Sequence, residues 1–103
     1  MTKFHIKWIK NESLMPQDLA MMAKLQLSML EGVKALMKSG DITDWGSYCD
    51  ASGGYCIVEG NEAEIFDAIM KWYPYVSFDA KPVLSVDQVI ESINKAIVES
   101  KPK

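Results

Sequence analysis

Two polar residues far apart in the sequence could form a proton-transfer site. His5 is the only histidine of the 103-residue sequence, so any acid–base step by an imidazole at neutral pH must use it. His5 shares one face of a predicted strand with Lys7, and Asp79 lies in a later strand that we expect to pair with it. A histidine oriented by a carboxylate can move a proton next to a carbonyl group. His5 and Asp79 are therefore the candidate catalytic residues. The alternative is that they are polar residues of a sheet face that is solvated or covered by another subunit.

Gln26 is polar at a position where the helical pattern calls for an apolar residue. Between Pro16 and Ser39 the apolar residues fall on one helical stripe, and Gln26 lies within it. A buried amide needs hydrogen-bond partners, and a ligand in a cleft between helix and sheet could be one of them. The alternative is a structural hydrogen bond to a backbone or hydroxyl group.

Aromatic and methionine side chains could form the apolar wall of such a cleft. We expect Met22, Tyr48 and Trp72 to line it together with Gln26. An apolar wall with a few convergent polar groups is the usual composition of a small-molecule site. Core packing is the alternative for these residues, because both types also fill the cores of small domains.

The two cysteines lie at equal distances from the centre of the pair Ser52–Gly53, which we take as a hairpin turn. A hairpin with that turn places Cys49 directly opposite Cys56, close enough for a bridge. We expect two reduced thiols, with a redox pair as the alternative, because disulfides are uncommon in the cytosol. Two cysteines and one histidine cannot complete a tetrahedral zinc site, so no metal is expected, and the sequence suggests no cofactor.

The spacing of the apolar residues predicts four strands that would position these candidates. Apolar and polar residues alternate in FHIKWI near the N-terminus and again from Val76 to Lys81. The segments DITDWGSYCD and YCIVEG flank ASGG, whose glycines suit the positive-φ positions of a hairpin turn.

Three helices are predicted between and after the strands. The first runs from Pro16 to Ser39, and the second opens with a capping pattern at Asn61 and ends before Pro74. The third opens with the same pattern at Ser85 and has an aliphatic face. The order β-α-β-β-α-β plus a C-terminal helix predicts an α+β, ferredoxin-like fold. We expect one domain over residues 1–103, with a four-stranded antiparallel sheet and helices on one face.

Several segments resemble the muconolactone isomerase family. KFHIKWI is similar to the Phe-His-aliphatic-Lys run of their first strand, and YPYVSFDA to their Pro-Tyr pair followed by a strand with an acidic residue, here Asp79. The segment from Lys38 to Glu59 is similar in length and pattern, and VSFDAKPVLSVDQVIESI is similar to the end of small uncharacterised domains of this fold. The resemblance implies a dimeric α+β barrel, in which two sheets pack face to face with the helices outside. It does not extend to the isomerase reaction, because no full catalytic set matches residue by residue.

The composition argues against several classes of partner. The net charge is −3, the sequence contains no arginine and the lysines are scattered, so nucleic acid is not an expected partner. Apolar runs stay below the roughly 18 residues of a membrane span, and the N-terminus lacks the apolar run of a signal peptide. We therefore expect a cytoplasmic protein that does not bind membranes. Motifs for Rossmann and P-loop nucleotide binding, zinc hydrolysis and serine hydrolysis are absent from the sequence.

Strand alternation predicts that the sheet separates the two groups of candidates. Phe4, Ile6 and Trp8 should meet the helices, so His5 should point into the interior of a homodimer formed through the sheet faces, or of a higher oligomer. Gln26 should face the helix side. We expect a small hydrophobic or carbonyl-type molecule there, and isomerase-like chemistry stays open. The alternative is a non-catalytic dimeric ligand sensor or interaction module that shares only the fold.

Overall fold

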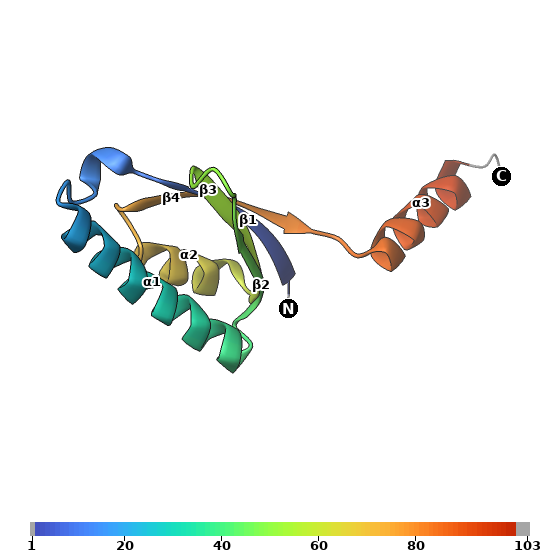
Figure 1. Ribbon diagram of the computed structural model, residues 1–103. Coiled ribbons are helices and arrows are strands. Elements are labelled where there is room, and N and C mark those ends of the chain that lie inside the picture. The colour runs from blue at the N-terminus through green and yellow to red at the C-terminus, as the bar shows by residue number, and fades with distance from the viewer. Residues whose placement is uncertain (1, 101–103) are drawn as a thin grey trace.

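The strand β1 (Thr2–Lys10) lies in the middle of an antiparallel sheet in the computed structural model, which describes residues 2–100. It pairs with β3 (Gly53–Gly60) on one side and with β4 (Val76–Val83) on the other, and β2 (Ile42–Ser47) extends the sheet beyond β3. The strand order is therefore β2-β3-β1-β4, which confirms the predicted ferredoxin-like arrangement (Figure 1). Pro82 lies in β4, an edge strand, where its missing amide proton is tolerated.

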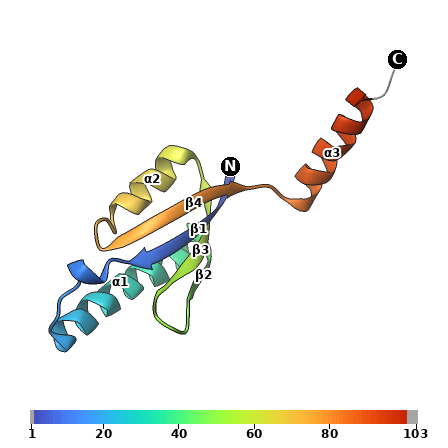
Figure 2. The ribbon, with the colours of Figure 1, turned by 90° about the horizontal axis from the view of Figure 1, so that it is seen from above.

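The helices α1 (Leu19–Ser39) and α2 (Glu62–Met70) lie side by side on one face of the sheet (Figures 1 and 2). α1 begins three residues later than Pro16, because Asp18 is its N-cap and accepts a hydrogen bond from Ala20 N at 2.9 Å. A short 3₁₀ turn, Glu12–Leu14, connects β1 to this helix. Among residues 2–100, no helix is long and apolar enough to span a bilayer.

The two predicted capping boxes are confirmed. At the start of α2, Asn61 Oδ1 accepts from Glu64 N at 2.9 Å while Glu64 Oε1 accepts from Asn61 N at 3.2 Å. At the start of α3 (Val86–Ser100), Ser85 and Gln88 form the same reciprocal pair at 2.8 and 3.1 Å. Each pair satisfies two amide donors that would otherwise lack partners, which explains where both helices begin.

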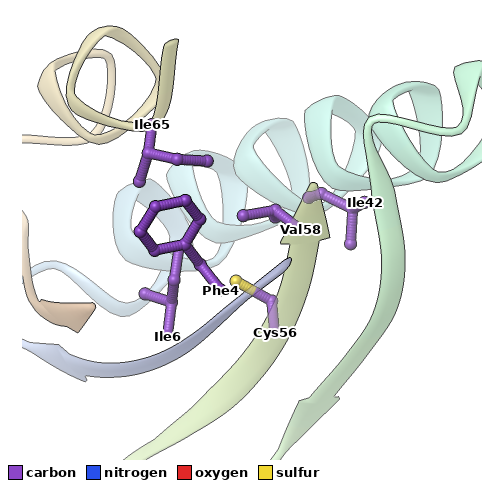
Figure 3. Close-up of a cluster of buried hydrophobic side chains, with 6 residues drawn as sticks. All are labelled: Phe4, Ile6, Ile42, Cys56, Val58 and Ile65. Atoms are coloured by element: carbon purple, nitrogen blue, oxygen red, sulfur yellow. The ribbon is translucent and has the colours of Figure 1, made fainter. Parts of the chain in front are cut away.

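The core lies between the sheet and the helices α1 and α2 (Figure 3). Phe4 and Ile6 of β1 are 5% and 4% exposed, whereas His5 and Lys7, which follow them in the alternation, are exposed on the other face. The predicted assignment of faces is thus confirmed. The buried cluster consists of Phe4, Ile6, Ile42, Cys56, Val58 and Ile65.

The predicted hairpin turn is wrong by two residues. β2 and β3 pair so that Trp45 faces Cys56, and the loop between them is centred on Asp50 and Ala51. Asp50 Oδ1 accepts from both the amide and the hydroxyl of Ser52, at 3.0 and 2.7 Å, which is an Asx turn. Ala51, not a glycine, has the positive φ of 64°. Cys49 consequently lies in the turn and does not face Cys56 across the strands.

The glycines that suggested the turn belong to β3 and allow close approach to β1 and β2. A Cβ on Gly54 would overlap the carbonyl oxygen of Gly46 and would lie 2.7 Å from Cε2 of Trp8. A Cβ on Gly53 would overlap the carbonyl oxygen of Trp8. These glycines are therefore needed because Trp8 is bulky and its strand is close, rather than because the chain reverses there.

The helix α3 lies away from the sheet and from the other helices (Figures 1 and 2). β4 leads out of the body of the protein into α3 through Leu84 and Ser85, and the molecule extends over 70 Å by 27 Å by 24 Å. No residue of α3 is buried.

We expect Gly54→Ala to lower the free energy of unfolding by about 1–3 kcal/mol, because its methyl group has no room beside Trp8 and Gly46. Gly60→Ala in the same strand is the matched control. Its Cβ would meet Glu64 and Ile65 at 3.6–3.7 Å, which is ordinary van der Waals contact. Urea unfolding of the two variants checks this, and equal stability of Gly54→Ala and wild type would contradict the role given to Gly54.

Candidate functional site

A cavity of about 330 Å³ lies between the helix-covered face of the sheet and the helix α1, and it is partly open to solvent. All four strands of the sheet, α1 and the segments that follow β1 and α2 contribute to its wall, which is mostly apolar. The larger apolar side chains in the wall are Trp8, Met15, Met29, Trp45, Trp72 and Phe78.

The tryptophans give the cavity a flat aromatic wall. Trp8 of β1 and Trp45 of β2 are stacked, with ring centroids 5.4 Å apart and planes inclined by 17°. The indole nitrogen of Trp8 donates to the carbonyl oxygen of Tyr55 at 3.3 Å, so the polar edge of this ring is already bonded. Trp72, just after α2, lies beside Gly32 of α1, where an added Cβ would be 3.4 Å from the ring. All three tryptophans of the sequence line this cavity.

Gln26 is the polar side chain that α1 contributes to the cavity wall. It is half-buried, and among residues 2–100 no hydrogen bond engages its side-chain amide. The alternative role of Gln26, a structural hydrogen bond to a backbone or hydroxyl group, is therefore not observed among the described residues. Lys10 and Ser47 also line the cavity, and the Ser47 hydroxyl donates to the carbonyl oxygen of Tyr48 at 3.2 Å. The Gln26 amide can therefore donate to and accept from a bound molecule.

Asn11 positions the end of the cavity nearest to Lys10. Its backbone amide donates to Tyr75 O at 2.9 Å, its Nδ2 donates to Pro74 O, and its Oδ1 accepts from the Ser77 hydroxyl at 3.0 Å. These bonds tie the end of β1 to the segment after α2 and so hold Trp72 and Val76 at the cavity. No pattern in the sequence marked Asn11 for this role, because its partners lie more than 60 residues away.

The expected ligand-binding residues are only partly brought together. Gln26 and Trp72 line the cavity, whereas Met22 and Tyr48 are not among the described residues that line it. Met22 is half-buried one helical turn before Gln26, and Tyr48 is 41% exposed because the shifted hairpin turn starts at this residue. Sequence reasoning placed Trp8 on the correct face but assigned neither Trp8 nor Lys10 to the ligand site.

The two proposed catalytic residues share the opposite face of the sheet, as expected, but they do not form a pair. Asp79 lies across from Lys7, whereas His5 lies across from Lys81, which makes a 3.4 Å ion pair with Asp79. Within the described residues no hydrogen bond joins His5 to Asp79. The sheet also separates both of them from Gln26, so they cannot act on a molecule in the cavity.

His5 instead stacks on an aromatic ring of the neighbouring strand. The rings of His5 and Tyr55 are nearly parallel, inclined by 3°, with centroids 6.1 Å apart. The Tyr55 hydroxyl donates to Asp44 Oδ2 at 2.9 Å, and this hydrogen bond to a carboxylate raises the pKa of Tyr55. The outer face of the sheet is thus a mixed aromatic and charged surface.

The two cysteines lie in different environments. Cys49 is exposed in the hairpin turn, and Cys56 is buried in β3, where it lines the cavity. Burial raises the pKa of the Cys56 thiol to about 11, because the thiolate would lose its hydration. Cys56 is therefore a neutral, unreactive wall group at physiological pH. The described part of the chain has no cluster of three or more histidine, cysteine or acidic residues that could hold a metal ion.

A family model described as Domain of unknown function (DUF3303) matches residues 3–97. The matched range covers the four strands, both helices on the sheet and most of α3. No curated protein matches the chain.

We expect thiol reagents to distinguish the two cysteines. At pH 8, 5,5′-dithiobis(2-nitrobenzoate) should modify Cys49 rapidly in the folded protein and reach Cys56 only after denaturation, because Cys56 is 7% exposed and protonated. Cys49→Ser is the matched control and should leave no rapidly reacting thiol. Rapid modification of both thiols, or a disulfide between them in the folded chain, would contradict this assignment.

Proposed function

The chain belongs to the DUF3303 family, and we propose that it binds a small, mainly hydrophobic molecule carrying a carbonyl-type oxygen in the cavity between α1 and the sheet. The observation that carries this proposal is the half-buried Gln26 amide, which lies without a protein partner among residues 2–100 on an otherwise mostly apolar wall. A polar group on an apolar wall favours a ligand that carries a polar atom of its own, because that atom completes the hydrogen bonding of the amide.

The size and shape of the cavity narrow the class of ligand. A volume of about 330 Å³ is at the small end of the range of known ligand sites, which suits a molecule of one or two rings. The stacked pair Trp8 and Trp45 offers a flat surface to such a ring. Lys10 at the wall favours a ligand whose oxygen bears partial or full negative charge.

Binding is better supported than catalysis. Among residues 2–100, the titratable groups that line the cavity are Lys10 and Cys56, and the Cys56 thiol is held neutral. An isomerase that moves a proton needs an acid or base with a pKa near the working pH, and His5 lies on the other side of the sheet. We therefore favour a ligand-binding or sensing role, and isomerase-like chemistry is the second candidate on the strength of the family resemblance.

We further propose that two copies associate through the outer faces of their sheets, in the cytoplasm. This face carries Ile9, which is 49% exposed, beside the half-buried Tyr55 and Ile57 and the ring of His5. An apolar and aromatic surface between charged residues is typical of a face that a partner covers. On this arrangement α1 and α2 lie outside, away from the contact between the two sheets.

We expect Gln26→Leu to remove the preference of the cavity for oxygenated rings. Small lactones and phenols should bind the wild type more tightly than hydrocarbon rings of matched size, by about 2- to 12-fold, which is the value of one hydrogen bond. Gln26→Leu should bind both classes equally, because the leucine side chain offers no hydrogen bond. Intrinsic fluorescence measures this directly, since all three tryptophans line the cavity.

His5→Ala is the matched control for this experiment. It should leave ring binding unchanged and weaken the association of two copies, because His5 lies on the outer face of the sheet. Loss of ring binding in His5→Ala with association intact would contradict the assignment of faces. Equal affinity of the wild type for lactones and hydrocarbon rings would contradict the role of Gln26.

A further inference from the structure

Figure 2 shows α3 apart from the rest of the chain, and the aliphatic side chains on one side of this helix are exposed. One side of the helix, which we call the α3 stripe, is 41–76% exposed. The α3 stripe consists of Val86, Val89, Ile90, Ile93 and Ile97. Its spacing places these residues within about 100° of one another around the helix axis, as on a helix that packs against a partner.

A helix of this length and composition is not expected to be stable alone in water. α3 has 15 residues, near the limit below which isolated helices are marginal. Its stripe residues are all β-branched, which lowers helix propensity because their side chains lose rotamer freedom. The capping box at Ser85 defines the start of the helix but cannot replace packing. α3 therefore requires an apolar surface to pack against.

The helix α1 carries an exposed aliphatic surface of the matching kind. We call it the α1 ridge, and it consists of Leu19, Leu27, Leu30 and Met37, which are 75%, 64%, 40% and 42% exposed. At 100° per residue these four side chains fall within about 80° around the helix and span about 27 Å, longer than the roughly 16 Å of the α3 stripe. The α1 ridge is thus long enough to receive the whole stripe.

The net charges of the two helices are opposite. α1 carries Lys24, Lys34 and Lys38 against one glutamate, Glu31, which gives a net charge of +2. α3 carries Asp87, Glu91 and Glu99 against one lysine, Lys95, which gives −2. Two helices with like charge would repel when packed, whereas this pair attracts.

The connection after β4 is too short for α3 to reach the α1 ridge of its own chain. β4 and β2 are opposite edges of the sheet, about 14 Å apart at the usual strand spacing, and Leu84 and Ser85 together span at most about 7 Å. The ridge also faces away from α2, because Gly32, on the other side of α1, is the residue beside Trp72. The surface that fits α3 is therefore available on another copy.

We propose that α3 packs its stripe onto the α1 ridge of a second copy of this chain. A twofold axis lets each copy provide one α3 and receive one, so that both surfaces are covered in both chains. Leu30 belongs both to the α1 ridge and to the cavity wall, so the partner's helix would cover the cavity on that side. This inference concerns assembly and does not depend on which molecule the cavity binds.

Hydrogen exchange of the α3 amides in the full-length chain tests the proposal. At high protein concentration these amides should be protected, and protection should fall on dilution as copies separate. Ile93→Asp should speed their exchange by about tenfold, because it removes an anchor at the centre of the stripe. Val98→Asp is the matched control, since Val98 is 68% exposed but lies off the stripe, and it should change little.

Charge reversal identifies the surface on which α3 packs. The double variant Lys34→Glu/Lys38→Glu should weaken α3 protection at high concentration, and adding Asp87→Lys/Glu91→Lys should restore it. Circular dichroism and urea unfolding of the α1 variants establish that their fold is intact. Three outcomes would each overturn the proposal. The first is protection that does not depend on concentration, and the second is unprotected α3 amides in the wild type at high concentration. The third is failure of the second pair of substitutions to restore protection.

Discussion

The packing of Trp8 in the central strand is the constraint on which the rest of the structure depends. Its indole ring occupies the space that side chains at position 54 would otherwise fill, and its backbone approaches Gly53 equally closely. The ring stacks on Trp45 and bonds Tyr55 O, so β1, β2 and β3 are all held relative to this one side chain. The cavity lies beside Trp8, whose ring forms part of its wall.

The sheet separates the polar residues on its two faces into two groups that cannot act on the same bound molecule. On the helix side, Gln26 and Lys10 meet an apolar, aromatic wall. On the outer side, His5, Tyr55 and Asp44 form a stacked and hydrogen-bonded group that is exposed in a single chain. The separation supports the proposed ligand site on one face and the proposed association on the other, because His5 and Asp79 cannot reach a molecule beside Gln26.

The exposed apolar surface of the chain is unusually large for a molecule with so small a core. The buried cluster contains six side chains, whereas α1, α2 and α3 all expose large aliphatic or aromatic residues. Exposed surface of this extent is characteristic of chains that complete their packing with a partner. In the association we propose, the opposite charges of α1 and α3 would add specificity, since they disfavour packing of either helix on a copy of itself.

The local elements could be predicted from sequence because their causes are local. The alternation of Phe4, Ile6 and Trp8 and the capping pairs at Asn61 and Ser85 involve residues within a few positions of each other, and both predictions are confirmed. The position of the hairpin turn could not be predicted, because Gly53 and Gly54 are required by the close approach of Trp8, which lies more than 40 residues earlier in the chain. The composition of the cavity wall and the position of α3 away from the sheet were likewise decided by tertiary structure. The composition of the cavity wall depends on the register of β1, β2 and β3, and the position of α3 depends on the short connection after β4. Neither feature leaves a periodic signal in the sequence.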